Sequence, residues 1–455
     1  IWRYRRTPAN SAYHNPTARA AYLTASGAVL PSFGNSETVA MIALNLICIP
    51  LLLISVYRIG ELLAEARCGA IAACILATMP LVFGLSRHFL VETPLTAFLT
   101  VGFLFLLKSQ RLSLLKWNIA FGVTAALGLL VKVTYPVYVF GPLCLVVIKR
   151  LKYSNHDAFQ RRFITDIISV LIPVILIAGP WYLINTPHWI QFAIQRSFWF
   201  SGYFVPIPLL SFWKTFADVG ISPYYALLLI VSIILWILRS QRMPRQWSME
   251  LIIWFILPAL IFSVGKNRDI RYLLPALPAL SLILACNFPF NKGRLAVLAL
   301  LALPLANLVY VSFYSGPSIP AKGFALLGTY SGYSSSARRE NWKTLEVIAR
   351  VRQQLSGSRS NVLVVSLHPY FEVNVFNYES LRQGHPIQFS LLKPEVIVEG
   401  PSERVINHAK EFDYIMYKTG DQGPEISNRF NRALFEALEN EMLPSVEIIS
   451  KTINS

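Results

Sequence analysis

The stretch KNRDIRYLLPALP, residues 266–278, places a basic segment between two apolar runs, 249–264 and 272–287. A helix needs ~20 predominantly apolar residues to cross a bilayer, and each run approaches that length. The connection between the runs holds three cations and a single carboxylate, which leaves a local charge of +2. We therefore predict two membrane-spanning helices joined by a short basic loop.

The rest of the chain repeats this pattern of apolar runs. Of its 455 residues, 54% are hydrophobic and only 14% are charged, whereas about a quarter of the residues in soluble domains carry a charge. Several runs are shorter than a straight span requires, so neighbouring helices must help to shield them. We predict a polytopic α-helical membrane protein with about ten spans, at residues 38–57, 68–84, 94–107, 117–131, 135–148, 164–184, 222–238, 249–264, 272–287 and 295–312.

The positions of Lys and Arg predict the orientation of these spans. A net charge of +17 would also attract nucleic acid, but short basic clusters between apolar runs are typical of cytoplasmic loops, and we expect no nucleic-acid partner. If 38–57 runs inward, the 266–271 cluster lies outside the cytoplasm, where basic residues are scarce. The loops then assigned to the cytoplasm contain Arg58, Arg67, Lys108, Arg111, Lys116, Lys149, Arg150, Lys152, Arg161, Arg162, Arg239, Arg242, Arg245, Lys292 and Arg294.

We predict four parts of the chain. Residues 1–37 form an extracytoplasmic first loop with a juxtamembrane segment, and 38–312 form the multi-span domain in the plasma (inner) membrane. Residues 313–340 form a linker, and 341–455 form a small extracytoplasmic α/β domain. The sequence begins with Ile and a polar segment that lacks the pattern of a signal peptide. We interpret it as a fragment whose first span lies upstream.

The C-terminal part alternates helix and strand patterns. Residues 361–367 and 413–417 read as buried strands, and Ser427 opens a later helix that is followed by a strand at 446–449. An earlier amphipathic helix is marked by Trp342, Leu345, Ile348, Val351 and Leu355. These elements predict an α/β domain with a modest core.

The cysteines give no sign of a disulfide framework or of a cysteine-based metal site. All five lie in or beside apolar runs, and none lies in the polar C-terminal third. Neither kind of site is therefore expected.

The first motif with chemical potential is SRHFLVETP, residues 86–94, between two predicted spans on the outer side. Glu92 stands at the mouth of a span, where a carboxylate is placed to act as a base or as a metal ligand. An ordinary polar loop, with Arg87 and Glu92 as a surface ion pair, explains the motif equally well. His88 alone reads as structural rather than as a ligand.

Lys132 interrupts more than 25 largely apolar residues. A lysine at the centre of a span costs ~2.5–3.5 kcal/mol unless it reaches water, an anion or the headgroup layer. We place Lys132 at the outer interface, in a tight turn before Pro136. Its ammonium can contact lipid phosphate there or bind a specific anionic ligand.

The basic loop of 266–271 is a second candidate for anion binding. Lys266, Arg268 and Arg271 lie beside the hydroxyl group of Tyr272, and each charge-assisted hydrogen bond to a phosphate contributes ~1.5–3 kcal/mol. Anchoring to lipid headgroups is the alternative. The position outside the cytoplasm favours a phosphate site.

The order of these motifs resembles the GT-C superfamily of integral membrane glycosyltransferases. More narrowly, it resembles the bacterial branch related to protein mannosyltransferases and the lipid A aminoarabinose transferase. The similarity spans roughly residues 10–312, and the C-terminal domain is similar to extracytoplasmic domains that many members carry. The ordered elements are His14-Asn-Pro16, the 86–95 segment, Leu-Val-Lys132, Gly-Pro-Trp181-Tyr and the 266–278 segment.

The resemblance implies an enzyme that transfers a sugar, with inversion, from a polyprenyl-phosphate carrier to a lipid, glycan or protein acceptor on the outer side. The multi-span domain is then catalytic, and Glu92 is its acidic residue in this chain. The family's main acidic residue lies in the first outer loop, in a segment that this chain lacks. The donor phosphate is expected on Lys132, Lys266, Arg268, Arg271 and Tyr272, with support from Arg87, His88 and His14.

The sequence leaves alternatives for the cofactor and for the class of function. Some members of the superfamily use a divalent metal, for which Glu92 is the candidate ligand here, but no recognisable cage of ligands appears. A multi-span transporter or flippase for a lipid-linked or anionic substrate is the alternative function, and a non-catalytic scaffold of the same fold is another. The absence of an inverted repeat and the charges at the outer mouth favour the enzyme.

Overall fold

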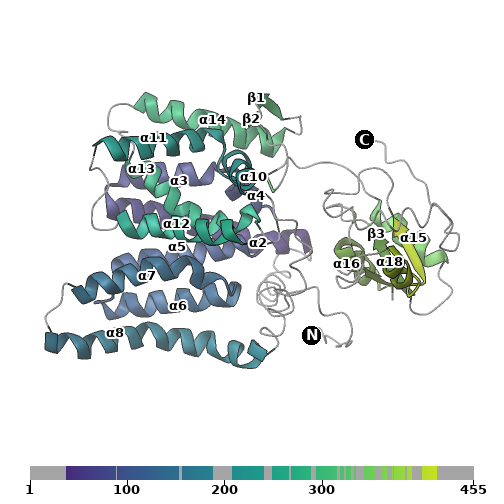
Figure 1. The fold of residues 1–455 in the computed structure, drawn as a ribbon, viewed down its shortest axis with the longest axis horizontal. Coiled ribbons are helices and arrows are strands. Elements are labelled where there is room, and N and C mark those ends of the chain that lie inside the picture. The colour runs from purple at the N-terminus through teal and green to yellow at the C-terminus, as the bar shows by residue number, and fades with distance from the viewer. Residues whose placement is uncertain are drawn as a thin grey trace. The chain divides into compact units, whose positions relative to one another are not determined.

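A computed structural model of the chain describes residues 37–88, 90–152, 156–187, 208–239, 248–265, 268–287, 294–314, 318–321, 324–328, 333–334, 343–354, 360–365, 371, 373–384, 387–391 and 402–417. The described residues up to 334 form a helical unit, and those from 343 onward form a second compact unit (Figure 1). We describe each unit by itself.

The helical unit contains a helical element at the site of every predicted span. The helices lie side by side in Figure 1, with α5 packed between α2 and α6, α8 against α6, and α12 against α7. Their bounds are α2 (Glu37–Leu63), α3 (Ala66–Ala77), α4 (Pro80–Leu85), α5 (Glu92–Lys108), α6 (Leu115–Val131), α7 (Tyr135–Lys152), α8 (His156–Ile177), α10 (Leu209–Thr215), α11 (Pro223–Arg239), α12 (Ser248–Val264), α13 (Leu277–Asn287) and α14 (Arg294–Phe313), with a π-helix η3 (Phe216–Gly220) and a 3-10 helix η4 (Ile270–Ala276).

Two of the described helices are long and apolar enough to cross a membrane by themselves, Ala43–Leu63 and Ile270–Asn287. Two bent pairs, Arg162–Ile177 with Gly179–Pro187 and Leu209–Gly220 with Pro223–Ile234, raise the number to four if each pair is one span. The total of ten spans stays a prediction. Large apolar side chains face outward on the helices, as lipid contact requires, among them Ile47, Ile54, Ile168, Leu176, Leu227 and Ile230.

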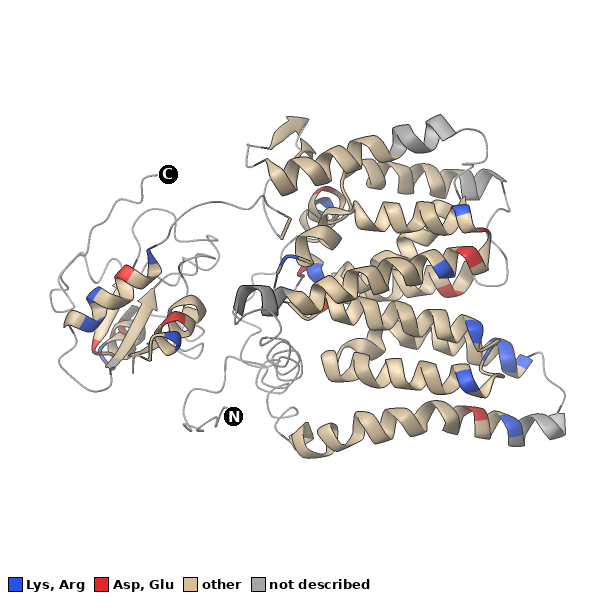
Figure 2. Cartoon of the chain, turned by 180° about the vertical axis from the view of Figure 1, so that it is seen from behind, with Lys and Arg blue, Asp and Glu red and all other residues tan. Residues whose placement is uncertain are grey.

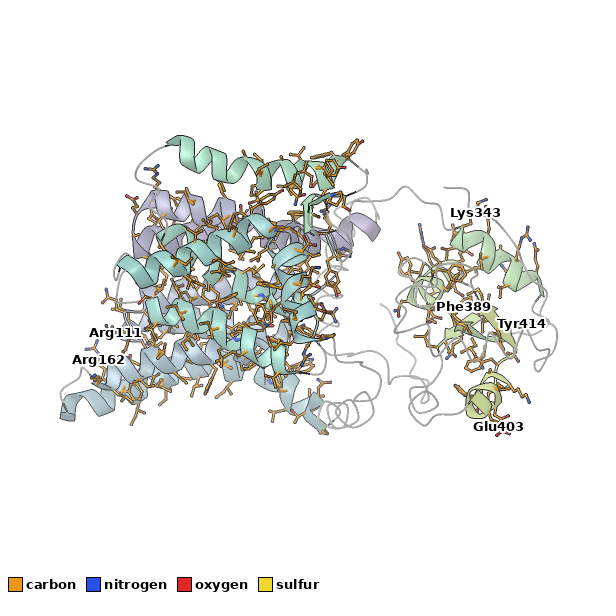
Figure 3. All side chains as sticks on the ribbon, turned by 45° about the horizontal axis from the view of Figure 1, so that its top comes forward. Arg111, Arg162, Lys343, Phe389, Glu403 and Tyr414 are labelled. Carbon is orange, nitrogen blue, oxygen red and sulfur yellow. The ribbon has the colours of Figure 1, made fainter. Side chains whose placement is uncertain are left out.

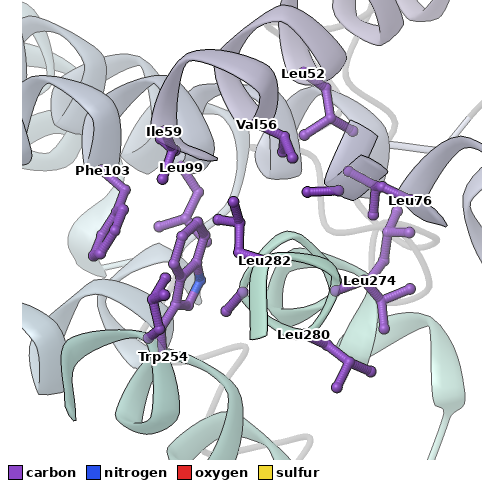
Figure 4. Close-up of a cluster of buried hydrophobic side chains, with 14 of the residues drawn as sticks. Leu52, Val56, Ile59, Leu76, Leu99, Phe103, Trp254, Leu274, Leu280 and Leu282 are labelled. Carbon is purple, nitrogen blue, oxygen red and sulfur yellow. The ribbon is translucent and has the colours of Figure 1, made fainter. Parts of the chain in front are cut away.

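The core of the helical unit holds the 3-10 helix η4 in place. Side chains from α2, α3, α5, α12, η4 and α13 meet in the cluster of Figure 4. Phe103 stacks obliquely on Trp254 with ring centroids 4.4 Å apart, and the Trp254 indole N–H donates to the carbonyl oxygen of Pro275, 3.1 Å away. Because Pro275 lies in η4, this buried contact fixes the segment that carries the basic loop.

Part of the predicted linker 313–340 packs on the helical unit. β1 (Ile319–Ala321) and β2 (Phe324–Leu327) form an antiparallel hairpin. Asp218 accepts a hydrogen bond from the Ala325 backbone at 3.0 Å, and Asn307 accepts one from the Gly328 backbone at 2.7 Å. These buried side chains satisfy backbone groups that would otherwise be desolvated without partners.

The second unit has an α/β arrangement. In its parallel sheet, β3 (Ser360–Val365) lies between β4 (Ile387–Ser390) and β5 (Tyr414–Tyr417). Its core includes Phe376 and Phe389, and Phe389 is labelled in Figure 3. The predicted helix through Ile348 is α15. The predicted strands at 361–367 and 413–417 correspond to β3 and β5. The predicted helix after Ser427 and the predicted strand at 446–449 lie outside the described residues. The elements are α15 (Thr344–Gln354), β3 (Ser360–Val365), α16 (Val373–Arg382), β4 (Ile387–Ser390), α18 (Ser402–Ala409) and β5 (Tyr414–Tyr417).

Candidate active site

Three sequence-predicted site residues meet at one end of the helical unit. Glu92 is the first residue of α5, Lys132 directly follows α6, and Arg271 lies in η4. Figure 2 shows that acidic and basic residues gather at the two ends of these helices, with uncharged residues between them. Helix packing therefore brings together residues that are about 40 and 140 positions apart in the sequence.

Glu92 is the buried centre of this cluster, with 3% of its surface exposed. Its Oε1 atom lies 2.8 Å from the Lys132 ammonium and 3.7 Å from Nε of Arg271. Its Oε2 atom is also buried and accepts no hydrogen bond from any described residue. The alternative of a surface ion pair with Arg87 is wrong, because Glu92 is buried and pairs with other cations.

The ionised form of Glu92 is favoured by these neighbours. Burial by itself raises the pKa of the carboxyl group, but the charges of Lys132 and Arg271 and the hydrogen bond from Lys132 outweigh it, so the pKa lies below the ordinary value. Glu92, which precedes the predicted span at 94–107, is therefore a weak base and a strong partner for cations.

A tight connection between α6 and α7 positions Lys132. Residues 132–134 alone separate the two helices, and Pro136 stands in the first turn of α7, where its fixed φ angle suits a helix start. Gly128 allows the turn to close, because a Cβ atom there would lie 2.2 Å from the buried ring of Tyr135. The local sequence thus fixes the point from which the lysine side chain extends.

Asp269 positions Arg271. Its Oδ1 accepts the Arg271 backbone N–H at 3.0 Å and caps η4, while its Oδ2 lies 2.9 Å from the Arg271 Nε atom. From the sequence alone, this aspartate is only an offset to the charge of the cluster. The same carboxylate in fact sets both the backbone and the guanidinium of the arginine.

Tyr272 brings its ring as well as its hydroxyl group to the cluster. Nζ of Lys132 lies 4.6 Å from the ring centroid, and Cζ of Arg271 lies 5.2 Å from it, so both cations contact the aromatic face. Tyr138 donates a hydrogen bond to the Tyr272 carbonyl oxygen at 2.8 Å. Arg268 lies beside this group and donates from Nε to the Ser263 carbonyl oxygen at 2.7 Å, at the end of α12.

Two further residues support the segment that leads to Glu92, and sequence analysis missed both. Asn45, buried in α2, donates from Nδ2 to the carbonyl oxygens of Ser86 and His88 at 3.2 and 2.8 Å. Tyr333 contacts His88 through its carbonyl oxygen, 2.9 Å from Nε2. A single Asn in an apolar run was the available signal for Asn45; a tyrosine in a loop-like segment gave none.

The remaining sequence-predicted residues lie apart from the carboxylate or outside the description. Arg87 is exposed and donates from Nε to the Phe83 carbonyl oxygen at 3.0 Å, and His88 is exposed beside Tyr333. Lys266 and His14 lie outside the described residues.

The described residues do not fit a divalent metal. Within them, no group of three or more His, Cys, Asp or Glu side chains is arranged to hold one. Glu92, the candidate ligand, carries two cations on Oε1, and these would repel a metal ion. An anionic ligand suits the cluster better, because the cations are more accessible than the carboxylate. The side chains of Lys132 and Arg271 are 14% and 28% exposed, whereas that of Glu92 is 3% exposed.

The chain is similar in sequence to known membrane glycosyltransferases. Residues 18–190 match the family model described as dolichyl-phosphate-mannose-protein mannosyltransferase. The chain is 24% identical over 270 residues to the undecaprenyl phosphate-alpha-4-amino-4-deoxy-L-arabinose arabinosyl transferase of Yersinia pestis, which covers 56% of the chain and 46% of that relative. It is 25% identical over 261 residues to undecaprenyl phosphate-alpha-4-amino-4-deoxy-L-arabinose arabinosyl transferase 2 of Proteus mirabilis. This alignment covers 53% of the chain and 44% of the relative.

A solved structure shares the fold. The crystal structure of ArnT from Cupriavidus metallidurans bound to undecaprenyl phosphate aligns with a TM-score of 0.53 and 13% identity, over 87% of this chain and 78% of that one. The chain spans a little under half the length of its curated relatives. The predicted resemblance to GT-C glycosyltransferases is confirmed, and the chain is an α-helical integral membrane protein.

Proposed function

We propose that this protein is a glycosyltransferase that moves a sugar from a polyprenyl-phosphate carrier to a lipid, glycan or protein acceptor on the extracytoplasmic side, with inversion. The observation that carries the proposal is the buried Glu92 carboxylate with Lys132 and Arg271 on one of its oxygens. The names of the curated relatives, which are undecaprenyl-phosphate sugar transferases, support the choice of donor.

The cations bind the phosphate of the donor. In a single displacement, an acceptor oxygen forms a bond to the anomeric carbon while the bond from that carbon to the phosphate oxygen breaks. The bonding electrons stay on the phosphate, which gains a second negative charge. Lys132, Arg271, Arg268 and Lys266 stabilise this charge, and the hydroxyl group of Tyr272 donates to the same phosphate.

Glu92 holds the two cations next to each other, with Lys132 Nζ 2.8 Å and Arg271 Nε 3.7 Å from its Oε1 atom. A carboxylate whose pKa is lowered by two cations accepts a proton poorly, so we assign the acceptor's proton to another carboxylate outside this cluster. Glu92 acts on the phosphate through Lys132 and Arg271. Glu92 therefore positions the cations and does not act as the base, one of the roles that the sequence allowed for it.

The topology agrees with an extracytoplasmic site. Glu92 begins α5 and Lys132 follows α6, and the distribution of basic residues assigns these helix ends to the outer side. Arg111 and Arg162 of the predicted cytoplasmic loops lie together at one end of the helices (Figure 3). Nucleotide sugars are absent from the outer side, so a lipid-linked donor is required there. We propose that the second unit is also extracytoplasmic.

Transfer in membranes tests the proposal. Membranes containing the full chain are supplied with a radiolabelled undecaprenyl-phosphate sugar and a lipid acceptor, and Arg271→Ala is expected to lower transfer ~100-fold. Arg58→Ala, which removes an exposed arginine from a surface ion pair, serves as the matched control and should leave the rate unchanged. Translocation of the labelled lipid across the vesicle membrane without transfer of its sugar would support a flippase and defeat the enzyme.

A further inference from the structure

Tyr333 links the two segments that carry the acidic and basic halves of the site. Its hydroxyl group donates to Asp269 Oδ2 at 2.9 Å, and its carbonyl oxygen accepts a hydrogen bond from His88 Nε2 at 2.9 Å. His88 lies four residues before Glu92, and Asp269 lies two residues before Arg271. One residue beyond α14 thus contacts both segments.

The contact on Asp269 is shared. Oδ2 accepts a hydrogen bond from the Tyr333 hydroxyl group and also lies 2.9 Å from Arg271 Nε. A carboxylate oxygen that accepts a hydrogen bond has part of its negative charge neutralised, so the tyrosine weakens the ion pair between Asp269 and the guanidinium. Because Arg271 Nε also lies 3.7 Å from Glu92, the position of the guanidinium depends on the balance between the two carboxylates.

Tyr333 is itself held in place by packing. Its ring meets the His88 ring edge-on, with centroids 5.9 Å apart. Ser334 lies against Gly84 at the end of α4 so closely that a Cβ atom on Gly84 would stand 2.9 Å from the Ser334 Cα atom. Burial and the Asp269 carboxylate raise the pKa of Tyr333, so the hydroxyl group stays protonated and remains a donor at physiological pH.

We propose that Tyr333 is a positioning residue of this site, which sets the reach of the Arg271 guanidinium toward the donor phosphate by sharing Asp269 with it. The inference rests on the proposed function. Tyr333 does not touch the phosphate; it acts through Asp269. Without its hydroxyl group, Asp269 draws Arg271 away from Glu92 and from the phosphate, and binding of the donor weakens.

Tyr333→Phe tests this role with a control at the same end of the helices. The variant is expected to raise the KM for the undecaprenyl-phosphate sugar about fivefold, as for the loss of about 1 kcal/mol of hydrogen bonding, and to change kcat by less than twofold. Tyr224→Phe also removes one hydroxyl group, which donates to the Leu326 carbonyl oxygen of the hairpin, and should leave KM unchanged. An unchanged KM in Tyr333→Phe, with an active wild type, overturns the inference.

A double-mutant cycle with Asp269→Asn separates an action through Asp269 from general loosening. Asparagine keeps the Oδ1 cap of η4 but places an amide where Oδ2 accepts the tyrosine proton, so Tyr333→Phe should have no further effect on KM in that background. Thermal unfolding of the same four proteins gives a second readout. If Tyr333→Phe lowers the melting temperature equally in the wild-type and Asp269→Asn backgrounds, the inference is overturned, whether or not the wild type transfers sugar. A wild type that transfers no sugar would by itself defeat only the proposed function.

Discussion

Both ends of the helical unit bury a glutamate that is paired with a lysine from elsewhere in the unit, yet the two pairs differ in how completely they are satisfied. Glu250 at one end receives Lys149 on both oxygens, at 2.7 and 2.9 Å. Glu92 at the other end carries two cations on Oε1, and its Oε2 accepts no hydrogen bond from the described residues. The first pair is closed, and the second is open to a further ligand.

A neighbouring pair extends the contrast. Arg150 pairs with Asp166 and also donates to the carbonyl oxygens of Arg111 and Leu112, so its guanidinium joins two helices to the loop between α5 and α6. A buried ion pair costs desolvation energy that only good geometry and further hydrogen bonds offset. The Glu250 and Asp166 pairs meet that requirement within the protein. Oε2 of Glu92 has no donor among the described residues, and we propose that Lys132 and Arg271 take up an anion.

The largest expected difference follows from removing each lysine. Lys132→Met should lower sugar transfer ~100-fold or more, because a cation that stabilises the leaving phosphate is lost. Lys149→Met leaves Glu250 buried without its partner, which costs about 3–5 kcal/mol of folding stability. Transfer assays normalised to folded protein, together with melting temperatures, distinguish the two effects. Equal rates per folded molecule in both variants would contradict an open site at Glu92.

Replacing the two glutamates should also affect transfer at Glu92 and stability at Glu250. Glu92→Gln is expected to lower transfer roughly 10- to 100-fold, since a charge-assisted hydrogen bond that holds Lys132 contributes ~1.5–3 kcal/mol. Glu250→Gln should lower the melting temperature and leave the rate per folded molecule as in wild type. A loss of transfer in Glu250→Gln equal to that in Glu92→Gln would mean that the opposite end also takes part in the reaction.

The pH dependence of stability reports the charge around Glu92. A carboxylate with a lowered pKa in the folded state stabilises the fold above its unfolded pKa, and this stability is lost as the pH falls through the folded value. Removing the Lys132 ammonium leaves burial, which raises the pKa, with less opposition. Lys132→Met should therefore move the change in stability that accompanies titration of Glu92 to a higher pH than in wild type, as measured by acid titrations of the melting temperature. Coincident titrations would show that Lys132 does not stabilise the ionised Glu92.

Close helix contacts offer a smaller test of the two ends. Gly128→Ala would place a Cβ atom 2.2 Å from the Tyr135 ring, beside the turn that carries Lys132. Gly60→Ala would place a Cβ atom 2.4 Å from the Gly69 Cα atom, where α2 meets α3. Each substitution should cost about 1–3 kcal/mol of stability through overpacking. Only Gly128→Ala should also lower transfer, because it shifts the lysine; melting curves and rates measured together show whether the two losses separate.

Hydropathy predicted where the helices lie, because the apolar runs are local signals, but it could not predict which helix ends meet. Glu92, Lys132 and Arg271 were each singled out from the sequence, while their contact depends on the packing of α5, α6 and η4. Asp269 and Tyr333 were not given a role, since a carboxylate that shares its oxygens and a tyrosine from a distant segment have no signature in sequence spacing. The number of spans stays a prediction for the same reason, as short helices need neighbours.

The smallest effect is expected for Arg87, an arginine that also contacts an aromatic ring at the site end. Arg87 is exposed, and its guanidinium lies over the Phe83 ring at 5.3 Å while Nε donates to the Phe83 carbonyl oxygen. Arg271 instead lies between two carboxylates and the ring of Tyr272. Arg87→Ala should change transfer by no more than about twofold, as for an exposed side chain outside such a network. A loss comparable to that of Arg271→Ala would place Arg87 on the phosphate and extend the site beyond the cluster around Glu92.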